Sequence, residues 1–300
     1  MKKKITLSNQ EKLVGWKMAT PALVFFLVTG IYPYIMNIYY SLTNWNLIHS
    51  GPVFTGAANY IKAFADSTFL LSVLRTFGFI AIVIPLEFCL GLGMALLLSR
   101  EDIKGKNIFR SLILLPMMLS PVVTSVIWKM MYSVQFGPLN YFFKVLGLSD
   151  GRTEWLSDPK LAFPALAVAT IWMWFPFSFL VLLAGLQSIP REQYESAKID
   201  GASWWNELRY ITLPNLLPSI MVVVLVRFLD ALKTFALVYT LTGGGPGSST
   251  ELIYYEIFRV AFRDFNIGYA SSLSIIVVLV SILACGLILK LSRKYASYEY

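Results

Sequence analysis

Three charged side chains interrupt one of the long apolar stretches of this 300-residue chain. Arg227, Asp230 and Lys233 stand three residues apart, so on a helix they lie near one face with alternating charge. At 1.5 Å per residue, Arg227 lies about 20 Å along a helix that begins at Pro214. Intramembrane charges usually face a bundle interior or a wet cavity. The triplet therefore either lines a path for a polar solute or forms a structural ion ladder, in which Lys233 reaches the surface.

Other residues that could do acid–base or metal chemistry are few and scattered. Glu87 follows Pro85 in an apolar block, where it could satisfy a freed backbone group or bond a neighbouring helix. His49 is the only histidine, and Cys89 and Cys285 lie in separate apolar blocks. The sequence holds no nucleophile–base–acid set and no metal-ligand spacing. It therefore predicts neither a catalytic site nor a metal site, and no cofactor on this chain.

The composition predicts the elements that carry these residues. Hydrophobic residues make up 57% of the chain and charged residues only 14%, whereas a soluble domain has about a quarter charged residues. A membrane helix needs about 20 apolar residues. We predict an all-α polytopic membrane protein with six transmembrane helices, at about 18–40, 70–98, 111–128, 161–187, 214–241 and 267–289. The first apolar run is too long for a signal peptide and is expected to be retained.

The distribution of basic residues predicts the orientation. Four regions share one side of the membrane if six helices are counted: the N-tail (1–17), the loop after the second helix, the stretch 190–213 and the C-tail (292–300). With their flanks they hold 15 of the 25 Lys and Arg residues. By the positive-inside rule, we expect both termini to be cytoplasmic, together with the loop 190–213 of a transmembrane permease domain over 18–291. The net charge of +8 is thus a topology signal and does not indicate a nucleic-acid partner.

The stretch 190–213 is a polar island between two apolar blocks. Pro190 suits the first turn of a helix, and REQYESAKI then has the pattern of a short amphipathic helix. Gly201 is a good stop because glycine tolerates the left-handed conformation. Trp204 and Trp205 suit the membrane interface. Two interpretations fit: a rigid helix–turn–helix knob for a partner, or an ordinary loop held by interfacial tryptophans.

The same stretch resembles the EAA loop of permease subunits from binding-protein-dependent ABC importers. The family pattern is an EAA triplet, DGA after two variable positions, and I-x-LP nine residues later. The matching residues are Glu195, Ala197, Asp200, Gly201, Ala202, Ile211, Leu213 and Pro214. Ser196 replaces the usual second alanine, which is a small change. Elsewhere LLPMMLSPVVTSVIWKMMYS, GPLN, AGLQSIP and LTGGGPGSSTE resemble the carbohydrate, maltose-type branch.

The resemblance implies the type I (MetI-like) ABC importer permease fold in a bacterial or archaeal cytoplasmic membrane. It also implies the partners, which are a second permease subunit, two ATPase subunits, an extracytoplasmic solute-binding protein and a sugar substrate. The loop 190–213 would be the coupling helix that docks into a groove on the ATPase, which alone hydrolyses ATP. The implied coupling residues are Glu195, Ser196, Ala197, Asp200, Gly201 and Ala202. For Asp200, capping of the following helix is the alternative.

Two further sets of residues are candidate contacts. Sugar C–H faces stack on aromatic rings, so Trp172, Trp174 and Phe175 are candidate substrate contacts together with the charged triplet, although such clusters are more often packing or lipid-facing. The run GGGPG lacks the GK[ST] of a phosphate loop and is expected to be a flexible turn. By resemblance the binding protein docks there, at Gly243, Gly244, Gly245 and Pro246.

The sequence is also compatible with other transport functions. The same type of importer could carry glycerol-phosphate or another polar solute. A secondary transporter that works without an ATPase is a further alternative, but it would need ion-coupling carboxylates, and the apolar blocks offer only Glu87 and Asp230. It would also leave the polar island unexplained.

Overall fold

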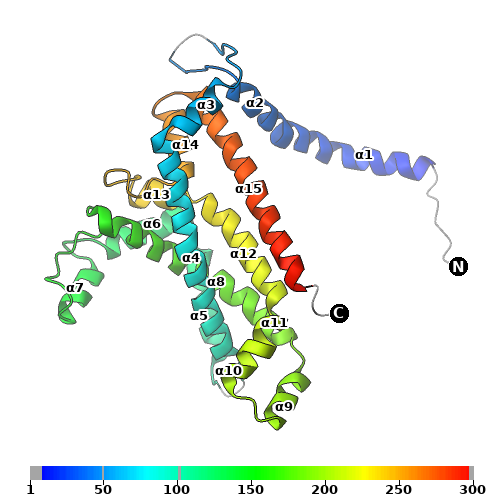
Figure 1. Cartoon of the computed structure of the whole chain (residues 1–300), viewed down its shortest axis with the longest axis vertical. Coiled ribbons are helices and arrows are strands. Elements are labelled where there is room, and N and C mark those ends of the chain that lie inside the picture. Colours follow the sequence, from blue (N-terminus) through cyan, green and yellow to red (C-terminus); the bar gives the residue numbers. More distant parts are fainter. Residues whose placement is uncertain (1–8, 49–50, 101–102, 297–300) are drawn as a thin grey trace. The chain divides into compact units, whose positions relative to one another are not determined.

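The computed structural model describes residues 9–48, 51–100 and 103–296. His49, residues 1–8 of the N-tail and residues 297–300 of the C-tail lie outside the described residues. Within the described ranges the regular structure is helical, apart from two isolated bridges, Thr43–Phe54 and Asn46–Asn266. The chain divides into two compact units, one of residues 1–66 with 257–279 and one of residues 67–256 with 280–300. Figure 1 labels the helices.

The first unit contains the N-terminal helices and the turns that follow them. Its elements are α1 (Asn9–Phe26), a π-helical turn (Leu27–Ile31), α2 (Tyr32–Ser41), α3 (Ala58–Ala65), the end of α14 (Ile253–Phe262) and the first part of α15 (Ile267–Ala296). The Asn59 side chain donates hydrogen bonds to the carbonyls of Ser41 and Thr43, both at 2.9 Å. The Tyr269 hydroxyl donates to Asp66 at 2.7 Å. These bonds tie α2, α3 and α15 together at one end of the unit.

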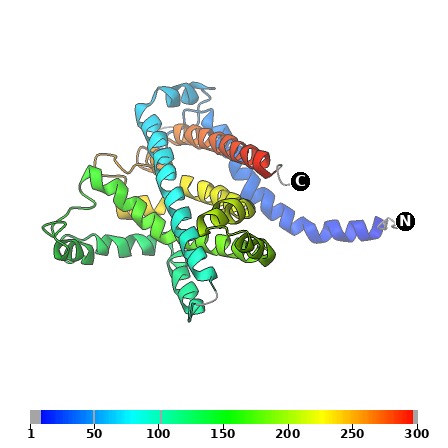
Figure 2. The same ribbon diagram turned by 60° about the horizontal axis from the view of Figure 1, so that its bottom comes forward.

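The second unit holds most of the polar residues of interest. Its elements are α4 (Ser67–Ser99), α5 (Lys106–Met118), α6 (Pro121–Met131), α7 (Pro138–Val145), α8 (Pro159–Ser188), α9 (Arg191–Ile199), α10 (Trp204–Glu207), a π-helical turn (Leu208–Thr212), α11 (Leu213–Asn215), α12 (Leu217–Leu232), α13 (Ala236–Leu241) and the start of α14. Helices α4, α8 and α12 pack side by side (Figures 1 and 2). Helices α9 and α10 lie at one end of this group (Figure 1).

A close approach of backbones organises this packing. A Cβ added to Gly91 on α4 would lie 2.6 Å from Cβ of Ser178 on α8, so only glycine lets the two helices come this near. Beyond this contact, Leu98, Leu182 and Val223 belong to a buried apolar cluster that α4, α8 and α12 share. The three helices are therefore held by small-residue contact at one level and by side-chain packing at another.

The membrane spans include two bent pairs of helices. Four helices are long and apolar enough to cross a membrane: residues 16–41, 67–99, 159–188 and 267–290. The pairs 106–118 with 121–131 and 204–215 with 217–232 pass the same test together, with bends of 99° and 66°, so the described residues hold up to six spans. The protein is thus an all-helical membrane protein with four to six candidate spans.

The continuous helices that the sequence predicts over 111–128 and 214–241 differ from the structure. The first is broken because Ser120 caps α6, its hydroxyl accepting a hydrogen bond from the Val123 amide at 3.3 Å, and proline follows at the first helical position. In the second region the helix that begins at Trp204 runs through Pro214 to Asn215 and bends at Leu216, and α12 starts at Leu217. Pro218 lacks the amide hydrogen that would continue the ladder.

Candidate functional site

The polar stretch after α8 folds as a short helix with a well-defined end. Helix α9 stops at Asp200, and Gly201 adopts φ +74°. The Gly201 amide donates to the Lys198 carbonyl at 3.1 Å and the Ala202 amide to the Ala197 carbonyl at 2.9 Å. This pair of bonds is a Schellman motif, which requires the left-handed conformation that glycine adopts without strain. The turn predicted at Gly201 is therefore present, and its cause is the helix C-terminus.

The helix that follows has its own cap. The Ser203 hydroxyl accepts from the Asn206 amide at 3.4 Å at the start of α10. Asp200 ends α9 and does not cap α10, so the alternative of a capping role for this residue is wrong. Its exposed carboxylate is thus left at the surface, beside exposed Glu195 and Ser196. Ala197 and Ala202 are partly buried.

One apolar residue on α9 was not among the predicted contacts. Ile199 is 86% exposed at the last position of a helix that is otherwise polar. Together with the small side chains of Ala197 and Ala202, this isoleucine gives the exposed end of α9 an apolar group on its surface. The sequence REQYESAKID shows an apolar residue at this position, but which face of the helix is exposed depends on how α9 lies on the bundle.

Hydrogen bonds hold α9 against α10 and α11. The hydroxyl of Tyr194 bonds that of Thr212 at 3.0 Å, and Thr212 donates to the Glu207 carbonyl at 3.2 Å. The side-chain amide of Asn215 donates to the side-chain oxygen of Gln193 at 2.8 Å. We call the segment from Arg191 to Asn215 the knob, because these bonds make it one unit.

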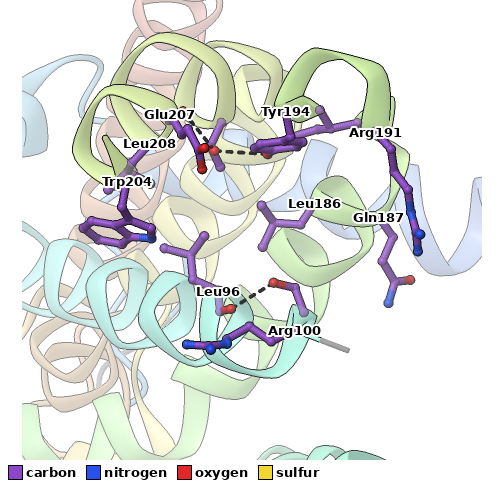
Figure 3. Close-up of a pocket in the computed structure, with 12 residues that line it drawn as sticks. Leu96, Arg100, Leu186, Gln187, Arg191, Tyr194, Trp204, Glu207 and Leu208 are labelled. Carbon is purple, nitrogen blue, oxygen red and sulfur yellow. Dashed lines mark hydrogen bonds between the residues drawn. The ribbon is translucent and has the colours of Figure 1, made fainter. Parts of the chain in front are cut away.

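A pocket separates the knob from the helices behind it (Figure 3). It has a volume of about 470 Å3 and lies between the ends of α4 and α8 and the inner side of the knob. Leu96 and Leu186 form an apolar wall of the pocket, while Tyr194 and Trp204 line it from the knob (Figure 3). The chain enters the knob after Ile189 and leaves it at Leu216, and both of these residues are buried.

Arg227 is the centre of a buried cluster that three helices build. Its Nε and Nη2 donate to the two carboxylate oxygens of Glu87 on α4, at 2.7 and 3.0 Å, and both side chains are 1% exposed. Its guanidinium carbon lies 4.4 Å from the ring centroid of Trp174 on α8. Asp230, one turn along α12, lies 3.7 Å from Nη1. Paired, forked bonds of this kind fix geometry as well as charge.

The cluster contains only some of the residues that the sequence predicts as substrate contacts. Arg227, Asp230 and Trp174 come together, while Glu87 joins them as the bonding partner on another helix. The Asp230 side chain is 42% exposed, so its carboxylate is open at the edge of the cluster. The signal for Glu87 was available, because a lone carboxylate and a lone arginine in apolar blocks are rarely stable unless they pair.

The remaining candidates lie elsewhere in the second unit. Lys233 is exposed at the end of α12. Trp172 is partly buried with its ring 5.9 Å from that of Trp128, and Phe175 is partly buried on α8. None of these three belongs to the Arg227 cluster.

The glycine-rich run after α13 forms a turn that side chains of the following segment contact. The Thr250 hydroxyl donates to the Gly245 carbonyl at 2.8 Å, and the Tyr255 hydroxyl donates to the Gly243 carbonyl at 2.5 Å. Gly244 has φ +82° and packs on the Tyr255 ring, where a Cβ would lie 2.5 Å away. The turn predicted for residues 243–247 is present, and side chains from the following segment hydrogen-bond to its carbonyls.

Among the described residues, no group of three or more His, Cys, Asp or Glu side chains is arranged to hold a metal ion. What the second unit offers is an exposed helix–turn–helix knob at one end and a buried ion cluster between three spans.

Comparison with known proteins identifies the family. Residues 87–297 match the family described as "Binding-protein-dependent transport system inner membrane component". The chain belongs to this family. It is therefore a transmembrane permease subunit of a binding-protein-dependent ABC importer and a multi-pass protein of the cytoplasmic membrane, and permeases of this family do not themselves hydrolyse ATP.

Individual relatives extend the match over nearly the whole chain. The trehalose/maltose transport system permease protein MalF of Thermococcus litoralis is 36% identical, over 92% of each chain. The lactose transport system permease protein LacF of Rhizobium radiobacter is 30% identical, over 88% of this chain and 89% of the relative. A chain of the bacterial alginate ABC transporter, solved with its alginate pentasaccharide-bound periplasmic protein, has a TM-score of 0.82 at 22% identity, covering 95% and 96%. The last comparison shows the fold, that of ABC importer permeases.

Proposed function

We infer that this permease carries a sugar or an oligosaccharide, and that the knob couples it to the ATPase. The names of two relatives, which refer to trehalose or maltose and to lactose, support the class of substrate. The observation that carries the coupling role is the capped, exposed end of α9, with Glu195, Ser196 and Asp200 on its surface and Ile199 open beside them. A rigid projection with a small apolar centre and a polar rim is suited to a protein partner.

The proposed assembly places the knob and both chain termini in the cytoplasm. The excess of Lys and Arg in the N-tail, the loop after α4, the knob and the C-tail supports this orientation. A second permease subunit completes the pathway, two ATPase subunits bind the knobs, and an extracytoplasmic binding protein delivers the sugar near Gly243, Gly244, Gly245 and Pro246. The hydrogen bonds from Thr250 and Tyr255 that hold this turn support the proposed docking there.

The proposed mechanism is alternating access. Closure of the ATPase around the knob moves α8 and α12, because the chain enters the knob from α8 and leaves it into α12 through Leu216. Nucleotide state and access to the pathway then become coupled equilibria. In the proposed pathway, Asp230 accepts hydrogen bonds from sugar hydroxyls and Trp174 contacts sugar C–H groups, with Trp172, Phe175 and Lys233 as further contacts; the exposed carboxylate of Asp230 supports its role. Arg227 shapes this surface from behind, since it is buried.

Transport measurements test this function directly. The cognate binding protein is first screened with neutral sugars and with glycerol-phosphate by thermal shift. Uptake of the best ligand is then measured in vesicles that contain both permeases and the ATPase. We expect uptake of a sugar that requires both ATP and the binding protein. Uptake driven by an ion gradient without ATP would support a secondary transporter, and stabilisation by glycerol-phosphate alone would change the substrate class.

A further inference from the structure

The Arg227 cluster connects a helix that is distant from the knob in sequence to the two helices that flank it. Helices α8 and α12 are joined to the knob through the chain, but α4 is separated from it by more than 90 residues. A bidentate ion pair joins Glu87 on α4 to Arg227 on α12. The Trp174 ring brings α8 to the same guanidinium. One side chain therefore contacts all three helices at one level.

The ion pair differs in kind from the packing around it. Apolar contacts between α4, α8 and α12, such as those of Leu98, Leu182 and Val223, are non-directional and can repack when a side chain changes. Two parallel hydrogen bonds between planar groups allow one relative register and one rotation. A buried pair of this kind is weak evidence for stability, and its better-attested role is to specify one arrangement.

The geometry also resists separation of α4 from α12. Both side chains are 1% exposed, so a shift that broke the pair would leave two charges without water around them. Asp230 does not replace Glu87 as a bonded partner, because it lies 3.7 Å from Nη1 and makes no hydrogen bond with it among the described residues. The Arg227 guanidinium is thus bound more closely by Glu87 on α4 than by Asp230 on α12.

We propose that the Glu87–Arg227 pair is a clamp that makes α4 follow α12, so that α4, α8 and α12 respond to the ATPase as one body. The clamp rests on the proposed coupling of the knob to the ATPase. Glu87 and Arg227 are then positioning residues: they touch neither nucleotide nor the ATPase, but they set how much of its movement reaches the pathway. Loss of the clamp would let ATP hydrolysis proceed while α4 lags behind.

Distances between spin labels test the clamp in the complete transporter. Cys89 and Cys285 are first replaced by alanine, and labels are placed on α4 at Leu86 and on α12 at Val226, whose side chains are exposed next to the pair. In the otherwise unaltered transporter we expect the same sharp distance without nucleotide and with ATP. A distance that changes between these two states overturns the clamp without any substitution in the pair.

A double substitution separates the clamp from mere stability. Glu87→Met/Arg227→Met removes both buried charges and leaves apolar side chains of similar length, so the complex is expected to assemble. The label distance should broaden, and the sugar imported per ATP hydrolysed should fall by about tenfold. Asp264→Asn breaks the more exposed Arg259–Asp264 pair and serves as the control, with no change expected. Wild-type stoichiometry in the double variant would overturn the clamp.

If the double variant fails to assemble, Glu87→Leu/Arg227→Leu supplies the same comparison, because it also removes both charges, whereas a single substitution would leave the other charge buried alone. A failure of the proposed function is distinguishable from a failure of the clamp. It would show in the unaltered transporter, as absence of ATP-dependent uptake, before any variant is made.

Discussion

Gly201 offers the sharpest test of the knob, because its conformation and its surroundings are both defined. It has φ +74°, and a Cβ at this position would meet no atom within 4 Å. Alanine therefore causes no clash within this chain, and its cost is the left-handed backbone alone. That cost is about 1–2 kcal/mol, or a factor of about 5 to 30 in the population of the capped loop. If the ATPase binds the capped loop, its apparent affinity falls by up to that factor.

The order of the variants identifies the cause. Asparagine is larger than alanine but adopts the left-handed conformation more readily. Backbone strain thus predicts affinity in the order Gly201, Gly201→Asn, Gly201→Ala, whereas a steric clash with the partner predicts that asparagine is worse than alanine. Gly201→Asp matches asparagine in shape and adds a charge beside Asp200, so it should leave assembly of the permeases intact and abolish substrate-stimulated ATP hydrolysis.

The assay is titration of the purified ATPase onto the reconstituted permease pair, followed by substrate-stimulated ATP hydrolysis. Equal affinity for the glycine, asparagine and alanine forms would refute the strain argument. Normal transport by Gly201→Asp would remove the coupling role from this turn.

Three further predictions concern packing, capping and the pathway. Gly91→Ala puts a Cβ 2.6 Å from Cβ of Ser178 and should destabilise the protein by about 1–3 kcal/mol. Gly93 lies on the same helix, and a Cβ there would meet no atom within 4 Å, so Gly93→Ala should be neutral or slightly stabilising. Thermal unfolding in detergent compares the two variants. Ser203→Ala removes the cap of α10 and should cost about 1 kcal/mol; limited proteolysis of the knob should accelerate, and an unchanged rate would count against the cap. Asp230→Asn should weaken the apparent affinity for sugar uptake while leaving ATPase binding unchanged; an unaltered uptake affinity would favour a purely structural Asp230.

The sequence was informative wherever a local rule decided the structure. Apolar length predicted helices in the regions of all six proposed spans, because the bilayer leaves few alternatives for the backbone. The end of α9 at Gly201 followed from the tolerance of glycine for the left-handed conformation. The bends at Ser120 and Leu216 were missed although Pro121 and Pro218 follow them. Hydropathy averages over such breaks, so a broken span and a straight one look alike.

Contacts between distant residues were beyond the reach of sequence patterns. Glu87 and Arg227 are 140 residues apart, and no spacing rule pairs them. The order of the turn at residues 243–246 likewise depends on Thr250 and Tyr255, whose side chains reach back to it. The exposure of Ile199 is visible only once the direction of α9 is known. In each case the tertiary structure decides which partner a residue contacts or whether its side chain is exposed.

Site-specific photocrosslinking tests most directly whether the end of α9 is where this permease meets its ATPase. A photoreactive amino acid replaces Ser196, which is exposed on α9, or Tyr141, which is exposed on α7 in the loop before α8 and serves as the control. Irradiation of native membranes should join the Ser196 variant to an ATP-hydrolysing protein and the Tyr141 variant to none. Absence of an ATPase from the Ser196 product, or an equal yield at Tyr141, would contradict the account.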